Sequence, residues 1–200
     1  MSFRFDPTMH EYWLEGDRLP SVSEIIAPIV DYSMVPEDRL AFAKDRGTAV
    51  HKACELYDLG TLDESSVDEE HVLPYLVAYR KFRTECEFEP EIIERPYYCK
   101  TLGFAGTPDR GGTLLLPSAT GRKRRVTAVV DLKTVAEMKP VIGVQLAGYA
   151  LLMERNGFVP EARIGLQLRK DGTYRVRTFG NEVPTFLSLR NLWSWRQKHE

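Results

Sequence analysis

The sequence predicts an α+β domain in which a central mixed β-sheet is flanked by helices, with an N-terminal hairpin and a C-terminal hairpin plus helix. Residues 37–59 and 69–85 repeat apolar side chains every three or four positions, as amphipathic helices do. From Glu91 the apolar spacing changes to two, which is typical of strands. A further apolar stretch over 141–156 predicts a buried helix between these strands and a later hairpin.

The N-terminal part is predicted to begin with a hairpin and a short helix. Apolar runs over 3–6 and 12–15 flank turn residues, as in a hairpin. The pattern Ser21-Val-Ser-Glu24 is a capping box and predicts a short helix through Ile29. Gly60 is expected to stop the next, longer helix, because glycine favours the position after a helix end.

The remaining elements are three strands, a hairpin and a final helix. The strands are expected at Glu91–Cys99, Thr101–Leu116 and Val126–Thr134. The third is apolar on both sides at Ala128-Val-Val, as a central strand should be. The hairpin pairs 162–168 with 174–179 and the helix covers 183–198.

Composition indicates a globular protein and narrows its function. Of the 200 residues, 43% are hydrophobic and 28% charged, which fits one domain over 1–200 with a core at about 37–179. No apolar run approaches the ~20 residues that span a bilayer, so we expect a cytoplasmic protein without membrane contact. The 3 cysteines lack Cys-x-x-Cys spacing, so no iron–sulfur cluster is expected. The net charge is only −2, but residues 1–100 are acidic and 101–200 basic, which allows a polyanionic partner.

Two charged residues interrupt the third strand. Asp131 and Lys133 lie two positions apart, so they share a face at about 7 Å separation. Asp109 in Gly106-Thr-Pro-Asp109 ends the preceding strand, and carboxylates on adjacent strands can share a divalent cation. A plain ion pair for Asp131 with Lys133, and a turn-capping role for Asp109, are the alternatives.

Two helices carry further polar pairs. His51 and Glu55 lie one turn apart on the first long helix, and Gln145 and Tyr149 one turn apart on the apolar helix. A structural histidine and a tertiary hydrogen bond of the buried amide are the alternatives to a shared functional site.

These pieces, in this order, resemble the PD-(D/E)xK nuclease superfamily, in particular its RecB-like branch of phage-type recombination exonucleases. The matching positions are Gly47 and His51, Asp109, the Asp131-Leu-Lys133 signature, and Gln145 with Tyr149; they span about half the chain. The resemblance implies a restriction-endonuclease-like core. The four cluster-binding cysteines of some relatives have no counterpart, and 200 residues cannot hold a helicase motor.

The resemblance also implies roles. Asp109, Asp131, the main-chain carbonyl of Leu132 and His51 would bind Mg²⁺ or Mn²⁺, and Lys133 would position the attacking water or stabilise the transition state. The products would carry a 5′-phosphate and a 3′-hydroxyl. A supporting carboxylate would come from Glu94 or Glu55, between which the sequence does not decide. DNA would be bound by the residues Gln145, Tyr149, Arg122, Lys123, Arg124 and Arg125.

The implied function is metal-dependent DNA exonuclease activity in phage or bacterial recombination or repair, in the cytoplasm of a bacterial or phage-infected cell. The alternatives are a catalytically silent nucleic-acid-binding module on the same fold, a structure-specific endonuclease, and a metallohydrolase for small phosphate esters. A single-strand annealing or single-strand-binding protein is a partner by analogy only. The sequence leaves strand polarity, single- or double-strand preference and oligomeric state open.

Overall fold

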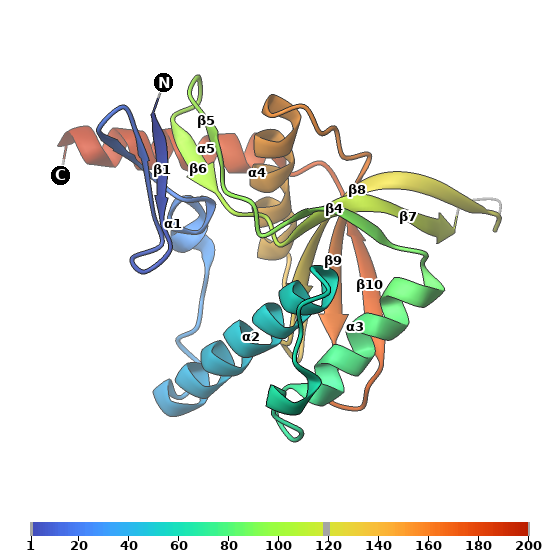
Figure 1. Cartoon of the computed structure of the whole chain (residues 1–200). Coiled ribbons are helices and arrows are strands. Elements are labelled where there is room, and N and C mark those ends of the chain that lie inside the picture. Colours follow the sequence, from blue (N-terminus) through green and yellow to red (C-terminus); the bar gives the residue numbers. More distant parts are fainter. Residues whose placement is uncertain (1, 118–120, 200) are drawn as a thin grey trace.

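The fold is a mixed five-stranded β-sheet with helices on both faces, as the sequence predicts (Figure 1). It is described from a computed structural model that covers residues 2–117 and 121–199. The sheet contains β4 (Glu89–Ile93), β7 (Arg110–Pro117), β8 (Lys123–Lys133), β9 (Ala162–Leu168) and β10 (Tyr174–Phe179). Its order is β10-β9-β8-β7-β4, and only β8 and β9 run parallel. The helix α4 (Val141–Arg155) connects these two parallel strands.

Each face of the sheet has its own helices and its own core. The helices α2 (Glu37–Asp58) and α3 (Leu73–Glu85) cover one face (Figure 1). The opposite face packs against α4, on whose other side lie α1 (Val22–Ile26) and α5 (Val183–His199). Strand β8 serves both cores, since Ala128, Val130 and Leu132 belong to the first and Val129 to the second. Because side chains alternate along a strand, Asp131 lies on the same face of the sheet as Val129, the face that α4 covers.

Two small sheets lie beside the main one, next to α1 and α5 (Figure 1). The first contains β1 (Phe3–Asp6), β2 (Glu11–Leu14) and β3 (Asp17–Leu19), one strand more than the expected hairpin. The second pairs β5 (Tyr97–Cys99) with β6 (Phe104–Gly106).

The second small sheet corrects the prediction of single strands at 91–99 and 101–116. The first of these breaks at Glu94, which has a φ of 43°, so the chain turns out of the large sheet there. A non-glycine residue in this left-handed region interrupts a strand, and such conformations concentrate at functional sites. The second breaks between Gly106 and Arg110, where Asp109 lies.

The predicted helices are otherwise close to those observed. The capping box is present, because Ser21 Oγ accepts from Glu24 N and Glu24 Oε2 accepts from Ser21 N. After α1 the chain continues as a 3₁₀ turn, η1 (Ala27–Ile29). Another such turn, η2 (Glu64–Ser66), lies between α2 and α3. Helix α3 starts four residues later than expected, since the Asp68 side chain first holds a turn by accepting from the amides of residues 70 and 71. None of the helices in the described ranges is long and apolar enough to cross a membrane.

Candidate metal centre

The predicted site residues come from strands that lie next to one another. Strand β7 pairs Arg110 with Ile93 of β4 on one side and with Val130 of β8 on the other. Asp109 comes directly before Arg110 and Asp131 directly after Val130. The antiparallel register therefore places these two acids opposite each other where β7 begins and β8 ends.

Three side chains form a group that could hold a metal ion: His51, Glu94 and Asp109, each offering one ligand atom, with all three atoms within 4.8 Å of one another. His51 Nδ1 lies 3.6 Å from Asp109 Oδ2 and 3.8 Å from Glu94 Oε1. Helix α2 supplies the histidine, and the ends of β4 and β7 supply the acids. Glu94 N also donates to the Asp109 carbonyl at 3.0 Å, which fixes the two acids relative to each other.

The main chain of Leu132 sets the orientation of two of these side chains. His51 Nε2 lies 2.9 Å from the Leu132 carbonyl oxygen, and Leu132 N donates to Asp109 Oδ2 at 2.7 Å. Because a carbonyl only accepts, Nε2 carries the hydrogen, and neutral His51 has its lone pair on Nδ1. That lone pair then faces two carboxylate oxygens. Three electron-rich atoms this close repel one another, and a proton or a cation between them would relieve the repulsion.

The Leu132 carbonyl, expected as a metal ligand, is thus in contact with His51. Its contact of 2.9 Å is with the hydrogen-bearing Nε2, so in this arrangement the carbonyl orients the imidazole whose Nδ1 faces the two acids.

Asp131 and Lys133 lie beside this group as an ion pair. Lys133 Nζ lies 2.6 Å from Asp131 Oδ2, and Asp131 is 0% exposed. Among the described residues, neither Asp131 oxygen accepts a hydrogen bond from another group. Burial raises the pKa of Asp131 to about 6, against the attraction of Lys133, and Asp109 adds to the rise. Burial opposes the charge of Lys133, but Asp131 and Asp109 together keep its pKa above the ordinary value.

Between the two candidate supporting carboxylates, the structure brings Glu94 to the group and not Glu55. Glu55 Oε2 accepts from Lys52 Nζ at 2.9 Å, and Glu55 is not in the group of converging ligand atoms, although its charge reaches Glu94. Burial and the neighbouring Asp109 raise the pKa of Glu94 to about 8, although Arg110 opposes this shift. A carboxyl group with such a pKa is mostly protonated at neutral pH, and a bound cation would stabilise its ionised form.

A buried charge network behind the centre escapes the sequence analysis. Arg110 is 0% exposed, and its Nε donates to Asp58 Oδ2 at 2.7 Å while its Nη1 donates to Glu94 Oε1 at 3.0 Å. Asp58 also accepts from Tyr79 at 2.6 Å and from Arg83. The sequence feature that could have pointed to Asp58 is its spacing from His51. Asp58 follows His51 by seven positions on the same helix and therefore shares its face.

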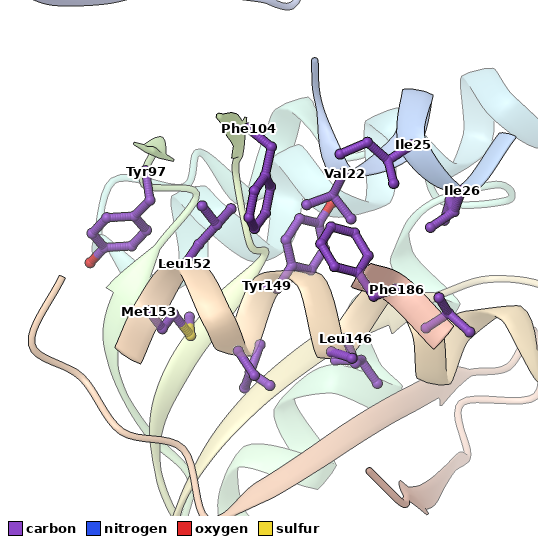
Figure 2. Packing of buried hydrophobic residues seen from close by; sticks show 14 of the residues in the cluster. Val22, Ile25, Ile26, Tyr97, Phe104, Leu146, Tyr149, Leu152, Met153 and Phe186 are labelled. Atoms are coloured by element: carbon purple, nitrogen blue, oxygen red, sulfur yellow. The ribbon is translucent and has the colours of Figure 1, made fainter. Parts of the chain in front are cut away.

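The expected DNA-binding residues are placed in two different environments. Tyr149 is 6% exposed, and Figure 2 shows its ring among the apolar side chains of Val22, Phe104 and Phe186. Burial, with Asp109 and Asp131 nearby, raises its pKa well above normal, and its hydroxyl accepts from Gln145 Nε2 at 3.2 Å. Burial leaves Tyr149 little surface for DNA, whereas Gln145 is half-buried.

The basic segment Arg122–Arg125 lies at the opposite end of β8 from the centre. Eight residues separate Lys123 from Asp131, which is about 26 Å of extended strand. Arg124 pairs with Glu161 and Arg125 with Glu87, both at 2.7 Å, and Lys123 donates to the carbonyl of residue 85 at 3.3 Å. The structure therefore does not bring these residues together with the metal group.

Comparison with known proteins assigns no family to the chain. No family model matches it, and no curated protein matches it. Chains of solved structures do match, and one of them is the crystal structure of SSO0001. That likeness has 14% identity and a TM-score of 0.37, and covers 86% of this chain and 72% of that chain.

Proposed function

We propose that the protein is a metal-dependent deoxyribonuclease that hydrolyses phosphodiester bonds, acting as a DNA exonuclease in bacterial or phage recombination or repair. The observation that carries this proposal is the convergence of His51 Nδ1 with the carboxylates of Glu94 and Asp109, beside the ion pair of the buried Asp131 with Lys133. Carboxylate oxygens with one imidazole nitrogen are a donor set for Mg²⁺ or Mn²⁺. The buried Asp131, whose Oδ1 has no partner among the described residues, fits a place beside such an ion.

Within this proposal His51, Glu94 and Asp109 would hold the metal ion, which would supply a lowered pKa for a water molecule and withdraw charge from the phosphate. The chain's own residues supply the rest. Lys133 is a partly exposed cation whose charge the two aspartates maintain, so it can donate to the water or to a phosphate oxygen as negative charge develops. The Leu132 main chain keeps His51 and Asp109 in the orientation that ligation needs.

DNA is the proposed substrate because two acids with a lysine suit phosphoryl chemistry and because residues 101–200 are basic. A single-strand annealing or single-strand-binding protein is a proposed partner, and the cytoplasm of a bacterial or phage-infected cell is the proposed location. Gln145 is the proposed contact to DNA nearest the centre, since its partner Tyr149 belongs to the surroundings of Asp109 and Asp131.

The test is a time course on linear and circular DNA, each single- and double-stranded, with Mg²⁺ or Mn²⁺. We expect degradation of linear DNA, resistance of both circles and no turnover without metal. Asp131→Ala and Lys133→Ala are expected to lower the rate at least about 100-fold, whereas Asp63→Asn, at an exposed acid in the loop after α2, serves as the control. Cleavage of circles would replace the exonuclease with an endonuclease, and binding without turnover would indicate a silent nucleic-acid-binding module. Full activity of Asp131→Ala would refute the assignment.

A further inference from the structure

Both acids of the candidate metal centre are held at one oxygen each by groups of the protein. Arg110 Nη1 donates to Glu94 Oε1 at 3.0 Å. Leu132 N donates to Asp109 Oδ2 at 2.7 Å. A carboxylate fixed in this way has limited freedom to turn both of its oxygens towards the same ion.

The guanidinium that donates to Glu94 is itself buried and held by further contacts. Arg110 is 0% exposed and donates to Asp58 Oδ2 at 2.7 Å and to its neighbour's carbonyl, Asp109 O, at 2.6 Å. Its guanidinium carbon lies 5.9 Å from the centre of the Tyr79 ring, and the Tyr79 hydroxyl donates to the same Asp58 carboxylate. Arg110 therefore joins the main chain of one acidic residue to the side chain of the other.

The backbone at Glu94 points to the same constraint. Its φ of 43° is a strained conformation for a residue with a side chain, and its amide donates to Asp109 O, the oxygen that also accepts from Arg110. Strain of this kind persists only where the surroundings determine the conformation several times over. The position of the Glu94 carboxylate is thus set from both its main chain and its side chain.

Such a centre discriminates between ions by the number of oxygens it can offer. Ca²⁺ takes six to eight oxygen ligands at about 2.3–2.6 Å and often binds a carboxylate through both oxygens. Mg²⁺ is smaller and needs a near-ideal octahedron at about 2.1 Å, to which each carboxylate gives one oxygen. Acids that are fixed at one oxygen fit the second arrangement.

We propose that Arg110 is a positioning residue that makes this centre selective for small six-coordinate ions over Ca²⁺, by holding Glu94 so that it offers a single oxygen. The inference rests on the metal site of the proposed function. It concerns the choice of ion, which is independent of whether the bound protein cleaves DNA.

The test measures ion affinity and not nuclease activity. Mn²⁺ binding to the full chain is followed by the loss of the free-ion electron paramagnetic resonance signal, and Ca²⁺ binding by competition. Arg110→Met is expected to weaken Mn²⁺ binding about tenfold, while Ca²⁺ binding is kept or strengthened, because the released carboxylate can then bind through both oxygens. The ratio of the Ca²⁺ to the Mn²⁺ dissociation constant therefore falls about tenfold.

The matched control is Arg83→Met. Arg83 donates to the same Asp58 and to the carbonyl of Phe88, but to no atom of Glu94, so its loss disturbs the network without releasing the ligand. We expect its ion ratio to equal that of the wild type. If Arg110→Met does not fold, as judged by circular dichroism, the double variant Arg110→Met/Asp58→Asn removes the orphaned charge and provides the measurement.

The outcomes separate this inference from the function on which it rests. If the wild type binds no Mn²⁺, both are overturned. If it binds Mn²⁺ but Arg110→Met weakens both ions by the same factor, or Arg83→Met lowers the ratio equally, Arg110 is only a structural residue. A falling ratio in Arg110→Met alone supports selection by this arginine, whatever the activity on DNA.

Discussion

Metal affinity is expected to rise steeply between pH 6 and pH 8, because binding must expel a proton from Glu94. Burial and Asp109 raise the pKa of this carboxyl to about 8, while Arg110 opposes the shift. At pH 6 the ion-free protein therefore holds Glu94 mostly protonated, and a cation needs the carboxylate. His51 and Asp109 face Glu94 in the group, and Glu55 on α2 adds to the rise of its pKa.

The size of the effect follows from the fraction of Glu94 that is ionised. With a pKa of about 8, that fraction is about 0.01 at pH 6 and about 0.5 at pH 8, so the Mn²⁺ association constant should rise about 50-fold. Asp131, with a pKa of about 6, adds about twofold if it also faces the ion. Calorimetric titration in buffers of different ionisation heat measures both the affinity and the number of protons released.

Glu94→Gln provides the decisive comparison. This variant should bind Mn²⁺ more weakly at pH 8, release about half a proton fewer at that pH, and keep only the roughly twofold change that Asp131 supplies. A wild-type affinity that changes less than about threefold from pH 6 to pH 8, in protein that stays folded, would refute the reasoning. So would a Glu94→Gln variant that shows the same pH slope as the wild type.

The remaining predictions concern stability and are measured by urea unfolding. Without metal, the free energy of unfolding should fall as the pH rises from about 6 to about 8, by at most roughly 1.4 kcal/mol per pH unit, because the folded state keeps a proton on Glu94 that the unfolded state has lost. Below about pH 6 the raised pKa of Asp131 adds to the slope, so Glu94→Gln should remove the slope only above that pH. Asp58→Ala should cost about 3–5 kcal/mol, since it leaves a buried arginine without its anion. Gly112→Ala should cost about 1–3 kcal/mol, because its Cβ would lie 2.1 Å from the Glu89 carbonyl oxygen, whereas Gly180→Ala, with open space around it, should change little. A stable Asp58→Ala variant, or equal effects at the two glycines, would contradict these assignments.

Regular elements are what the sequence predicts best here, because their signal is local and repeats. The helix over 141–156 and the hairpin over 162–179 lie within a residue of their predicted bounds. The strands predicted at 91–99 and 101–116 each break, the first at the left-handed residue Glu94 and the second between Gly106 and Arg110, and their inner pieces pair in a second sheet. Apolar periodicity carries no information about a single φ angle, so that turn was not predictable.

The candidate site likewise contains residues that the sequence reveals and residues that it does not. Asp109, Asp131 and Lys133 are charges in strands that should be apolar, which makes them visible in the sequence. The choice between Glu94 and Glu55 depends on where one strand ends relative to one helix, and the sequence alone does not fix that distance. The pair of Asp58 with Arg110 joins residues 52 positions apart, a contact that local patterns do not encode.

The location of buried charge favours the proposal that this end of the sheet binds an ion. Apolar side chains of similar volume usually stabilise a core at least as well as a buried ion pair. Within the described ranges, the charged residues that are buried as whole residues are Asp109, Arg110 and Asp131, and all three lie where β7 begins and β8 ends. The Asp58 carboxylate that pairs with Arg110 is 0% exposed as well. These charges lie beside His51 and Glu94, which together with Asp109 form the group that could hold a metal ion. Repulsion among these acids destabilises the folded protein. A cation bound between them would offset this repulsion, so the destabilising charges lie where an ion can bind.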